Sequence, residues 1–184
     1  MILFWIFLIF VVSQRVLELI VAKKNKEWIL SKGGYEVGAS HYKYFVLLHS
    51  FFFISLTIEV IFFTGGVAEW WVIPLTIFVC TQGIRIWCLR SLGRFWNTRI
   101  MILPGANIVE KGPYRWLRHP NYVIVMVEFL VIPLLFKAYI TMVLFSVLNM
   151  IILSIRISYE EKALIEATNY SEKFENKPRI IPQR

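Results

Sequence analysis

Two short polar segments border long apolar runs, and the first is suited to hold a small molecule. Residues 111–122 read KGPYRWLRHPNY. The rings of Tyr114, His119 and Tyr122 could stack on a nucleoside while their polar atoms form hydrogen bonds with it. A simple membrane anchor does not need this order of residues, so the segment predicts a binding site.

The second polar segment, residues 156–161, reads RISYEE and follows a long apolar run. A charge beside such a run is costly, which makes Arg156 a functional candidate. Arg156 and Glu160 are four residues apart and share one helix face. The simpler interpretation is an ion pair on the helix surface, worth a few tenths of a kcal/mol. That interpretation fits Glu161 and Lys162 best.

The local sequence predicts that the first segment is a structured loop just before a helix. Gly112-Pro113 marks a turn. His119 precedes a proline and therefore favours an extended backbone, while Pro120 is tolerated in a first helical turn. The simpler interpretation, a membrane anchor that contacts lipid phosphates and the interface, applies best to Arg115, Trp116 and Arg118.

The composition indicates a membrane protein. Hydrophobic residues make up 58% of the chain and charged residues 17%, against about 45–50% and 25% in soluble domains. The net charge of +8 lies in the gaps between apolar runs, which argues for membrane topology rather than nucleic-acid binding. Cys80 and Cys88 are about two helical turns apart, and the histidines are scattered, so we expect neither a disulfide nor a metal site.

Five apolar segments approach the roughly 20 residues that a membrane-spanning helix needs. The first lacks the basic start and cleavage site of a signal peptide, so we expect it to be a membrane helix. The fourth is short, and only Lys137 separates it from the fifth, which predicts a helical hairpin. The segments are Met1 to Val21, Tyr44 to Phe63, Trp70 to Leu89, Tyr122 to Phe136, and Ala138 to Ile155.

The basic residues predict the orientation of these spans. They fill alternate gaps, which places the N-terminus outside and the first loop, the third loop and the C-terminal tail in the cytosol. Both polar segments then lie on the cytosolic side, where the hairpin brings them together as one pocket. The residues that set this orientation are Lys23, Lys24, Lys26, Lys32, Arg90, Arg94, Arg99, Lys111, Arg115, Arg118, Lys162, Lys173, Lys177, Arg179 and Arg184.

Two acidic residues, Glu59 and Glu128, lie inside predicted spans. An ionisable residue within the membrane is a functional candidate by default. The simpler interpretation is a buried polar contact with Ser, Thr or Gln on a neighbouring helix. The sequence leaves their roles open.

The order GPYRxxRHPxY before one span, followed by RxxxEE after the next, resembles the isoprenylcysteine carboxyl methyltransferase family. The resemblance covers residues 95–182, within a single membrane domain over residues 1–184. The first loop, SKGGYEVGASH at residues 31–41, resembles a bacterial branch of the family. Some members of that branch are associated with methylation of long-chain pyrones or phenols, and we therefore expect a bacterial cell membrane.

The resemblance implies an all-helical membrane protein that binds S-adenosylmethionine without a Rossmann domain, and the chain has no GxGxxG motif. It implies that Arg156 faces the methyl acceptor. It further implies a strand-like stretch that contacts the cofactor mainly through its backbone. The implied cofactor-binding residues are Ala106, Asn107, Ile108 and Val109 in that stretch, with Tyr114, His119, Pro120, Asn121, Tyr122 and Glu160.

These implied roles agree with the chemistry of methyl transfer. Aromatic faces attract a sulfonium cation, and alignment for an in-line displacement supplies much of the catalysis. Arg156 could hold a carboxylate in bidentate fashion, or stabilise the anion of an enol or phenol. Access between the spans would admit a hydrophobic acceptor from the bilayer, such as an alkylpyrone, a phenol or an isoprenylcysteine carboxylate.

Two other classes of protein remain open. Membrane sterol and enone reductases that use NADPH carry a similar Arg-His-Pro-Asn-Tyr order, but usually have an acid soon after it. Here apolar residues follow Tyr122 directly, and the first acid, Glu128, comes six positions later, which argues against this class. A small membrane scaffold without enzyme activity would use the same polar segments as anchors and bind no nucleotide-like ligand.

Overall fold

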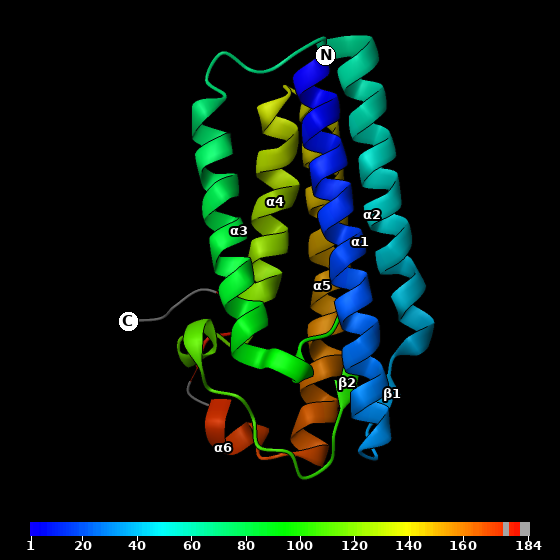
Figure 1. Cartoon of the computed structure of the whole chain (residues 1–184), viewed down its shortest axis with the longest axis vertical. Coiled ribbons are helices and arrows are strands. Elements are labelled where there is room, and N and C mark those ends of the chain that lie inside the picture. Colours follow the sequence, from blue (N-terminus) through cyan, green and yellow to red (C-terminus); the bar gives the residue numbers. More distant parts are fainter. Residues whose placement is uncertain (175–176, 181–184) are drawn as a thin grey trace.

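Five apolar helices run side by side along the long axis of the molecule (Figure 1). The computed structural model describes residues 1–174 and 177–180. Within these residues, four helices are long and apolar enough to cross a membrane, and α4 is shorter with 16 residues. The prediction of an all-α integral membrane protein is confirmed. The helices are α1 (Ile2–Ser31), α2 (Ala39–Glu59), α3 (Val72–Leu92), α4 (Pro120–Leu135) and α5 (Tyr139–Ala167).

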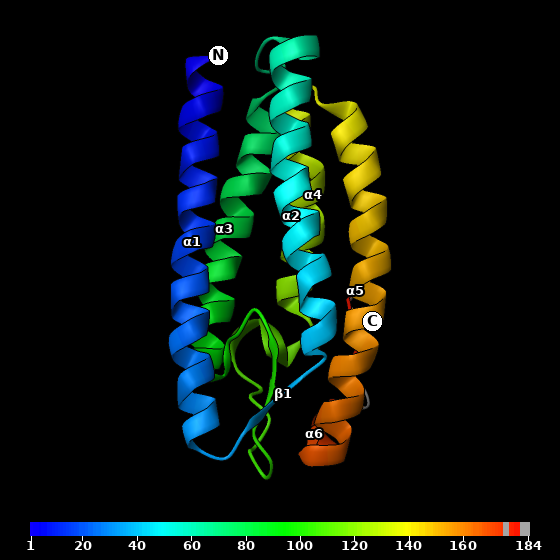
Figure 2. The ribbon, with the colours of Figure 1, turned by 90° about the vertical axis from the view of Figure 1, so that its right-hand side faces the viewer.

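The first and last of these helices are longer than the spans expected from the sequence. α1 has 30 residues and α5 has 29. At 1.5 Å per residue each is roughly 45 Å long, against about 30 Å for the bilayer hydrocarbon. Both helices extend at the end of the bundle that carries β1, β2 and α6 (Figures 1 and 2). The polar segment at residues 156–161 therefore lies on an unbroken helix.

Short elements connect the helices. The predicted hairpin between α4 and α5 is present, and Lys137 closes it with a φ of 59°, a conformation that few non-glycine residues adopt. Most of the other short elements gather at the opposite end of the bundle (Figure 1). These are β1 (Tyr35–Val37), the 3₁₀ turns η2 (Gly93–Phe95) and η3 (Gly112–Arg115), β2 (Ile100–Ile102) and α6 (Tyr170–Phe174). The π-helix η1 (Val60–Thr64) instead continues α2 at the hairpin end.

A two-stranded antiparallel sheet joins the first loop to the loop after α3. Tyr35 pairs with Ile102, and Val37 pairs with Ile100. Gly34 makes the approach possible, because a Cβ atom there would lie 2.6 Å from the carbonyl oxygen of Ile102. The sheet thereby ties the N-terminal helices to the C-terminal half.

The prediction of a strand-like stretch at residues 106–109 was wrong. These residues are irregular, and the strand lies earlier, at Ile100–Ile102. Residues 100–102 form a strand because they pair with β1. At residues 106–109 the backbone N–H of Ile108 instead donates to Asn169 Oδ1 at 3.0 Å. A side chain satisfies that amide in place of a second strand.

Aromatic rings fill the core at the end of the bundle opposite the sheet. Phe52 on α2 stacks on Phe129 on α4, with ring centroids 4.5 Å apart. Phe4 on α1 contacts Phe136 edge to face, with centroids 5.0 Å apart. Offset and edge-to-face pairs are the geometries that aromatic rings prefer. These contacts hold the helices together at a distance from the polar segments.

A buried ionic cluster joins α1, α3 and α4 inside the bundle. Arg85 donates hydrogen bonds to Glu128 at 2.5 Å and to Glu18 at 3.3 Å. Arg15 donates to Glu18 at 2.6 Å and to Glu128 at 2.8 Å. Gln82 also donates to Glu128, at 2.7 Å. Two arginines thus balance two glutamates, as buried charges require, and Glu128 has a structural role.

Glu59 has a different structural role from the one expected. Its carboxylate accepts hydrogen bonds from the backbone N–H groups of Ile140 at 3.0 Å and Thr141 at 2.7 Å. The first amides of a helix have no partner within the helix. Glu59 on α2 therefore caps the start of α5 through its backbone rather than pairing with a polar side chain.

Candidate active site

A cavity of about 150 Å³ lies among η3, the start of α4, the last turns of α5 and the loop that follows α3. We call it the loop cavity. Pro120 is buried at the first position of α4 and does not line it. The other predicted cofactor-binding residues all line it, and they are Ala106, Asn107, Ile108, Val109, Tyr114, His119, Asn121, Tyr122 and Glu160.

The turn η3 holds Tyr114 against α3. Gly112 has a φ of 56°, and a Cβ atom there would lie 2.1 Å from Ser91 Oγ. Only glycine lets the loop pack this closely against the helix. Tyr114 is 7% exposed and packs against Cys88. Burial, with the neighbouring Cys88 and Glu160, raises the pKa of the Tyr114 phenol well above its usual value, so its ring stays neutral.

A chain of hydrogen bonds runs from Arg156 through Tyr122 to Glu160. Arg156 Nε donates to Tyr122 Oη at 2.7 Å, and Tyr122 Oη donates to Glu160 Oε2. Arg156 Nη2 also donates to the carbonyl oxygen of Thr98 at 2.6 Å. The helix spacing predicted a shared face for Arg156 and Glu160, and the structure places the Tyr122 hydroxyl between them.

Glu161, expected in a surface ion pair, is buried. It is 4% exposed and accepts hydrogen bonds from His119 Nε2 at 3.1 Å and Arg179 Nη2 at 2.7 Å. The Tyr170 hydroxyl donates to Glu161 Oε1 at 3.3 Å. Burial, together with the nearby carboxylates of Glu161 and Glu160, raises the pKa of the Tyr170 phenol. The surface interpretation failed because Glu161 lies on the face of α5 that meets the loop and the C-terminal segment. Glu161 therefore fixes the position of His119.

His119 in turn supports Tyr122. Their rings stack with centroids 5.3 Å apart and planes 23° apart. The backbone N–H of His119 donates to the carbonyl oxygen of Arg179 at 3.2 Å, so the described part of the C-terminal segment crosses this loop. His119 thus supports the ring of Tyr122, whereas Arg156 and Glu160 hold its hydroxyl.

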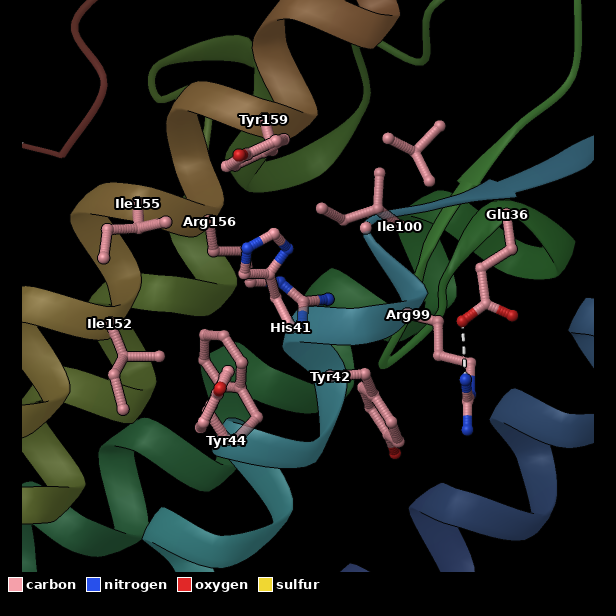
Figure 3. Close-up of a pocket in the computed structure, with 13 residues that line it drawn as sticks. Glu36, His41, Tyr42, Tyr44, Arg99, Ile100, Ile152, Ile155, Arg156 and Tyr159 are labelled. Atoms are coloured by element: carbon pink, nitrogen blue, oxygen red, sulfur yellow. Dashed lines mark hydrogen bonds and ion pairs between the residues drawn. The ribbon is translucent and has the colours of Figure 1, made fainter.

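A second cavity of about 270 Å³ lies between α2 and α5, and we call it the α2–α5 cavity. Its walls include the apolar side chains of Phe45, Ile152 and Ile155. Arg156 reaches this cavity, with its guanidinium 4.7 Å from the ring centroid of Phe45, and Figure 3 shows it beside the apolar wall. Arg99 lines both cavities. The two cavities therefore adjoin at a wall that carries arginine side chains.

The sheet places a charged group at this wall. Glu36 accepts hydrogen bonds from Lys26 and from Arg99, each at 2.5 Å (Figure 3 shows the second). Burial alone would raise the pKa of Glu36, but the two hydrogen bonds outweigh it and lower the pKa. The Arg99 guanidinium also lies 3.9 Å from the ring centroid of Tyr42. Glu36 and Arg99 are thus held as fixed charges.

The sequence-based analysis missed Glu36 and Arg99 as site residues. They are 63 positions apart and meet only because β1 pairs with β2. A strand pair of three residues on each side carries little sequence pattern. The charged and aromatic character of the first loop was the one indication available.

The fold and cavities define a helical integral membrane protein with a polar cavity at one end and an apolar cavity beside it. Residues 72–166 match the family model of the isoprenylcysteine carboxyl methyltransferase (ICMT) family. The chain belongs to this family, which indicates a membrane methyltransferase. The matched region runs from α3 through most of α5, and it includes both polar segments.

Two bacterial relatives extend the similarity to the N-terminal helices. The uncharacterized protein YpbQ of Bacillus subtilis (strain 168) is 44% identical over 163 residues, which cover 89% of this chain and 97% of YpbQ. An uncharacterized protein of Haemophilus influenzae is 23% identical over 155 residues, covering 84% of this chain and 90% of its own length. The similarity to YpbQ therefore extends beyond residues 72–166 into the N-terminal half of the chain.

Proposed function

We propose that this protein is an O-methyltransferase that holds S-adenosylmethionine in the loop cavity and a hydrophobic acceptor in the α2–α5 cavity. The observation that carries the proposal is the Arg156–Tyr122–Glu160 chain of hydrogen bonds, because Tyr122 and Glu160 line the first cavity and Arg156 lines the second. S-adenosylmethionine supplies an electrophilic methyl group on a cationic sulfonium.

The residues of the loop cavity fit this donor. Glu160 can accept hydrogen bonds from its amino or ribose groups, and the rings of Tyr114 and Tyr122 can face adenine or the sulfonium. Asn121 Oδ1 and Trp96 Nε1 are buried, and within the described residues neither has a hydrogen-bond partner. A buried unsatisfied polar atom is costly. Asn121 and Trp96 both line this cavity, so it offers one hydrogen-bond acceptor and one hydrogen-bond donor that suit the edge of a purine.

The α2–α5 cavity fits an apolar acceptor with one polar end. Phe45, Ile152 and Ile155 would surround the chain of the acceptor, and Arg156 would hold the oxygen that receives the methyl group. Because Tyr122 and Thr98 hold the guanidinium at 2.7 and 2.6 Å, its position is set before the acceptor enters. We favour a long-chain hydroxyl of the alkylpyrone or phenol type, and an isoprenylcysteine-type carboxylate is the alternative.

The same assignment implies a location in the cell. S-adenosylmethionine is polar and reaches the loop cavity from the cytosol, whereas a lipid-like acceptor enters between α2 and α5. Tyr44 and Ile155 at that gap are about half exposed, as side chains that contact lipid are. We therefore propose a bacterial cell membrane, with the loop cavity on the cytosolic side.

Calorimetric titration of the detergent-purified protein with S-adenosylmethionine and, separately, with NADPH tests the proposal. We expect binding of S-adenosylmethionine alone. The Glu160→Gln variant should weaken it about 10- to 100-fold, the effect of losing one hydrogen bond to a charged group. Glu166→Gln, the same change at an exposed position of α5, should bind like the unaltered protein.

Other outcomes of the titration would contradict the proposal in distinct ways. Binding of NADPH alone would indicate a membrane reductase. Binding of neither ligand by folded protein would indicate a scaffold. An unchanged affinity for S-adenosylmethionine in Glu160→Gln would show that Glu160 does not contact this ligand.

A further inference from the structure

His41 places an imidazole on the wall of the α2–α5 cavity. It lies in the first turn of α2 and lines the cavity together with Arg156. Its ring packs on Tyr159 of α5, with centroids 4.8 Å apart and planes 38° apart. Figure 3 draws His41 and Arg156 among the residues that line this cavity. An imidazole therefore lines the same cavity as the group that would hold the acceptor oxygen.

The other ionisable groups of this cavity are poor proton acceptors. The guanidinium groups of Arg99 and Arg156 have no free lone pair. Glu36 already accepts short hydrogen bonds from Lys26 and Arg99. The remaining ionisable groups on the lining are the phenols of Tyr42, Tyr44 and Tyr159, which are weak bases.

His41 is available to accept a proton. Its Nδ1 atom lies 3.5 Å from Ser40 Oγ, at the limit of a hydrogen bond. Its Nε2 atom has no hydrogen-bond partner among the residues that the structure describes. The residue is partly exposed, so a proton taken up in the cavity has a route to water. Imidazole is the most frequent general base in enzymes.

We propose that His41 is the general base of methyl transfer to a hydroxyl acceptor bound in the α2–α5 cavity. The proposal rests on the proposed function, because it assumes methyl transfer in this cavity. A carboxylate is already ionised and needs no base. A hydroxyl must lose its proton, and His41 is the group placed to receive it.

Methyl transfer forms one bond to carbon and breaks another. An oxygen lone pair of the acceptor forms the new bond to the methyl carbon, and the bond between that carbon and sulfur breaks. The electron pair of the broken bond stays on sulfur, so the sulfonium becomes a neutral thioether. The hydroxyl proton passes to His41 Nε2, and the imidazolium then releases it to water. Arg156 stabilises the negative charge that develops on the oxygen.

The first test measures methylation of a series of alkylphenols of different acidity by the unaltered protein and by His41→Gln. A positioned base contributes typically about 10²- to 10⁴-fold, so we expect a loss of about 10²-fold or more with weakly acidic phenols. With phenols that are already ionised in the assay, the methylation rate of His41→Gln should fall less than about threefold. Imidazole added to His41→Ala should restore part of the lost rate.

A second readout does not depend on turnover. A long-chain nitrophenol absorbs differently once it is ionised, so its spectrum reports the phenolate fraction in the cavity. Without donor, we expect binding to the unaltered protein to increase the phenolate fraction and binding to His41→Gln to increase it less. Lys43→Gln, an exposed position of α2 outside the cavity lining, should behave like the unaltered protein in both tests.

The outcomes separate this inference from the proposed function. S-adenosylmethionine binding by His41→Gln with normal affinity shows that the variant is folded. Equal loss for all acceptors, or an unchanged rate with weakly acidic phenols, would overturn the role of His41. Methylation of a farnesyl-cysteine carboxylate but of no phenol would overturn the acceptor class while leaving the proposed methyltransferase intact. Absence of any methylation by the unaltered protein would overturn both.

Discussion

Tyr122 links the two cavities through its hydrogen bonds, because it lines the loop cavity and contacts Arg156, which lines the α2–α5 cavity. Its hydroxyl accepts a hydrogen bond from Arg156 and donates one to Glu160, while its ring stacks on His119. Two of these partners have further contacts: Arg156 donates to the carbonyl oxygen of Thr98, and His119 contacts Glu161. A site with its side chains already fixed spends little binding energy on ordering them.

The proposed roles of Arg156 and Glu160 predict opposite kinetic effects. Arg156→Ala should lower the turnover number about 10²- to 10³-fold, because the charge that stabilises the acceptor oxygen is lost. The affinity for S-adenosylmethionine should change little, since Arg156 lines the other cavity. Single-turnover rates and calorimetry measure the two effects separately. Lys162→Ala, an exposed cation on the same helix, serves as the control.

The reverse result would exchange the two assignments. If Arg156→Ala lost its affinity for S-adenosylmethionine but kept the rate of the chemical step, Arg156 would hold the donor. The hydrogen bonds from Arg156 to Tyr122 and Thr98 would then serve the loop cavity alone.

At the scale of the elements, the ionic cluster fixes α1 and α3 to α4. Single removal of a buried ion-pair partner typically costs about 3–5 kcal/mol, because the other charge is left uncompensated. Glu128 has Arg85 at 2.5 Å and Arg15 at 2.8 Å. The cluster is neutral as a whole, so its charges support one another only while all are present.

We therefore expect Glu128→Leu to lower the free energy of unfolding by about 3–5 kcal/mol, measured by denaturant or thermal unfolding in detergent. The double variant Glu128→Leu with Arg85→Met should recover part of this loss, since it removes an unpaired charge as well. Glu69→Gln, at an exposed position between α2 and α3, is the control. A single variant as stable as the unaltered protein would show that the cluster does not support the bundle.

The largest scale concerns how the bundle lies in the membrane. Basic residues gather at the end that carries the loop cavity, and the positive-inside rule predicts that such an end lies in the cytosol. The connections at the other end carry Glu69 and Lys137 as their only charged residues. The proposed use of a cytosolic methyl donor requires the same orientation.

Labelling of single cysteines in intact cells tests this orientation. In a background with Cys80→Ala and Cys88→Ala, a membrane-impermeant maleimide should label Glu69→Cys in intact cells. It should label Lys111→Cys only after the membrane is opened. Both positions are exposed, so accessibility does not favour either. The opposite pattern would place the loop cavity outside the cell and contradict the proposed supply of donor.

The sequence by itself determined the class of protein, and it predicts where along the chain the chemistry lies. Long apolar runs must become helices in lipid, because backbone polar groups find no water there. The short spacer at Lys137 required a hairpin that joins the two polar segments. The order of residues 112–122 and of residues 156–161 was specific enough to indicate the ICMT family, which the match over residues 72–166 confirmed.

Only the tertiary structure decided which neighbours in the sequence share a cavity. Glu160 and Glu161 are adjacent, yet one lines the loop cavity and the other is buried against His119, because successive residues of a helix face different sides. Glu36 and Arg99 meet through two strands of three residues each. Such contacts depend on packing between distant segments, and their energies are not encoded in any local pattern.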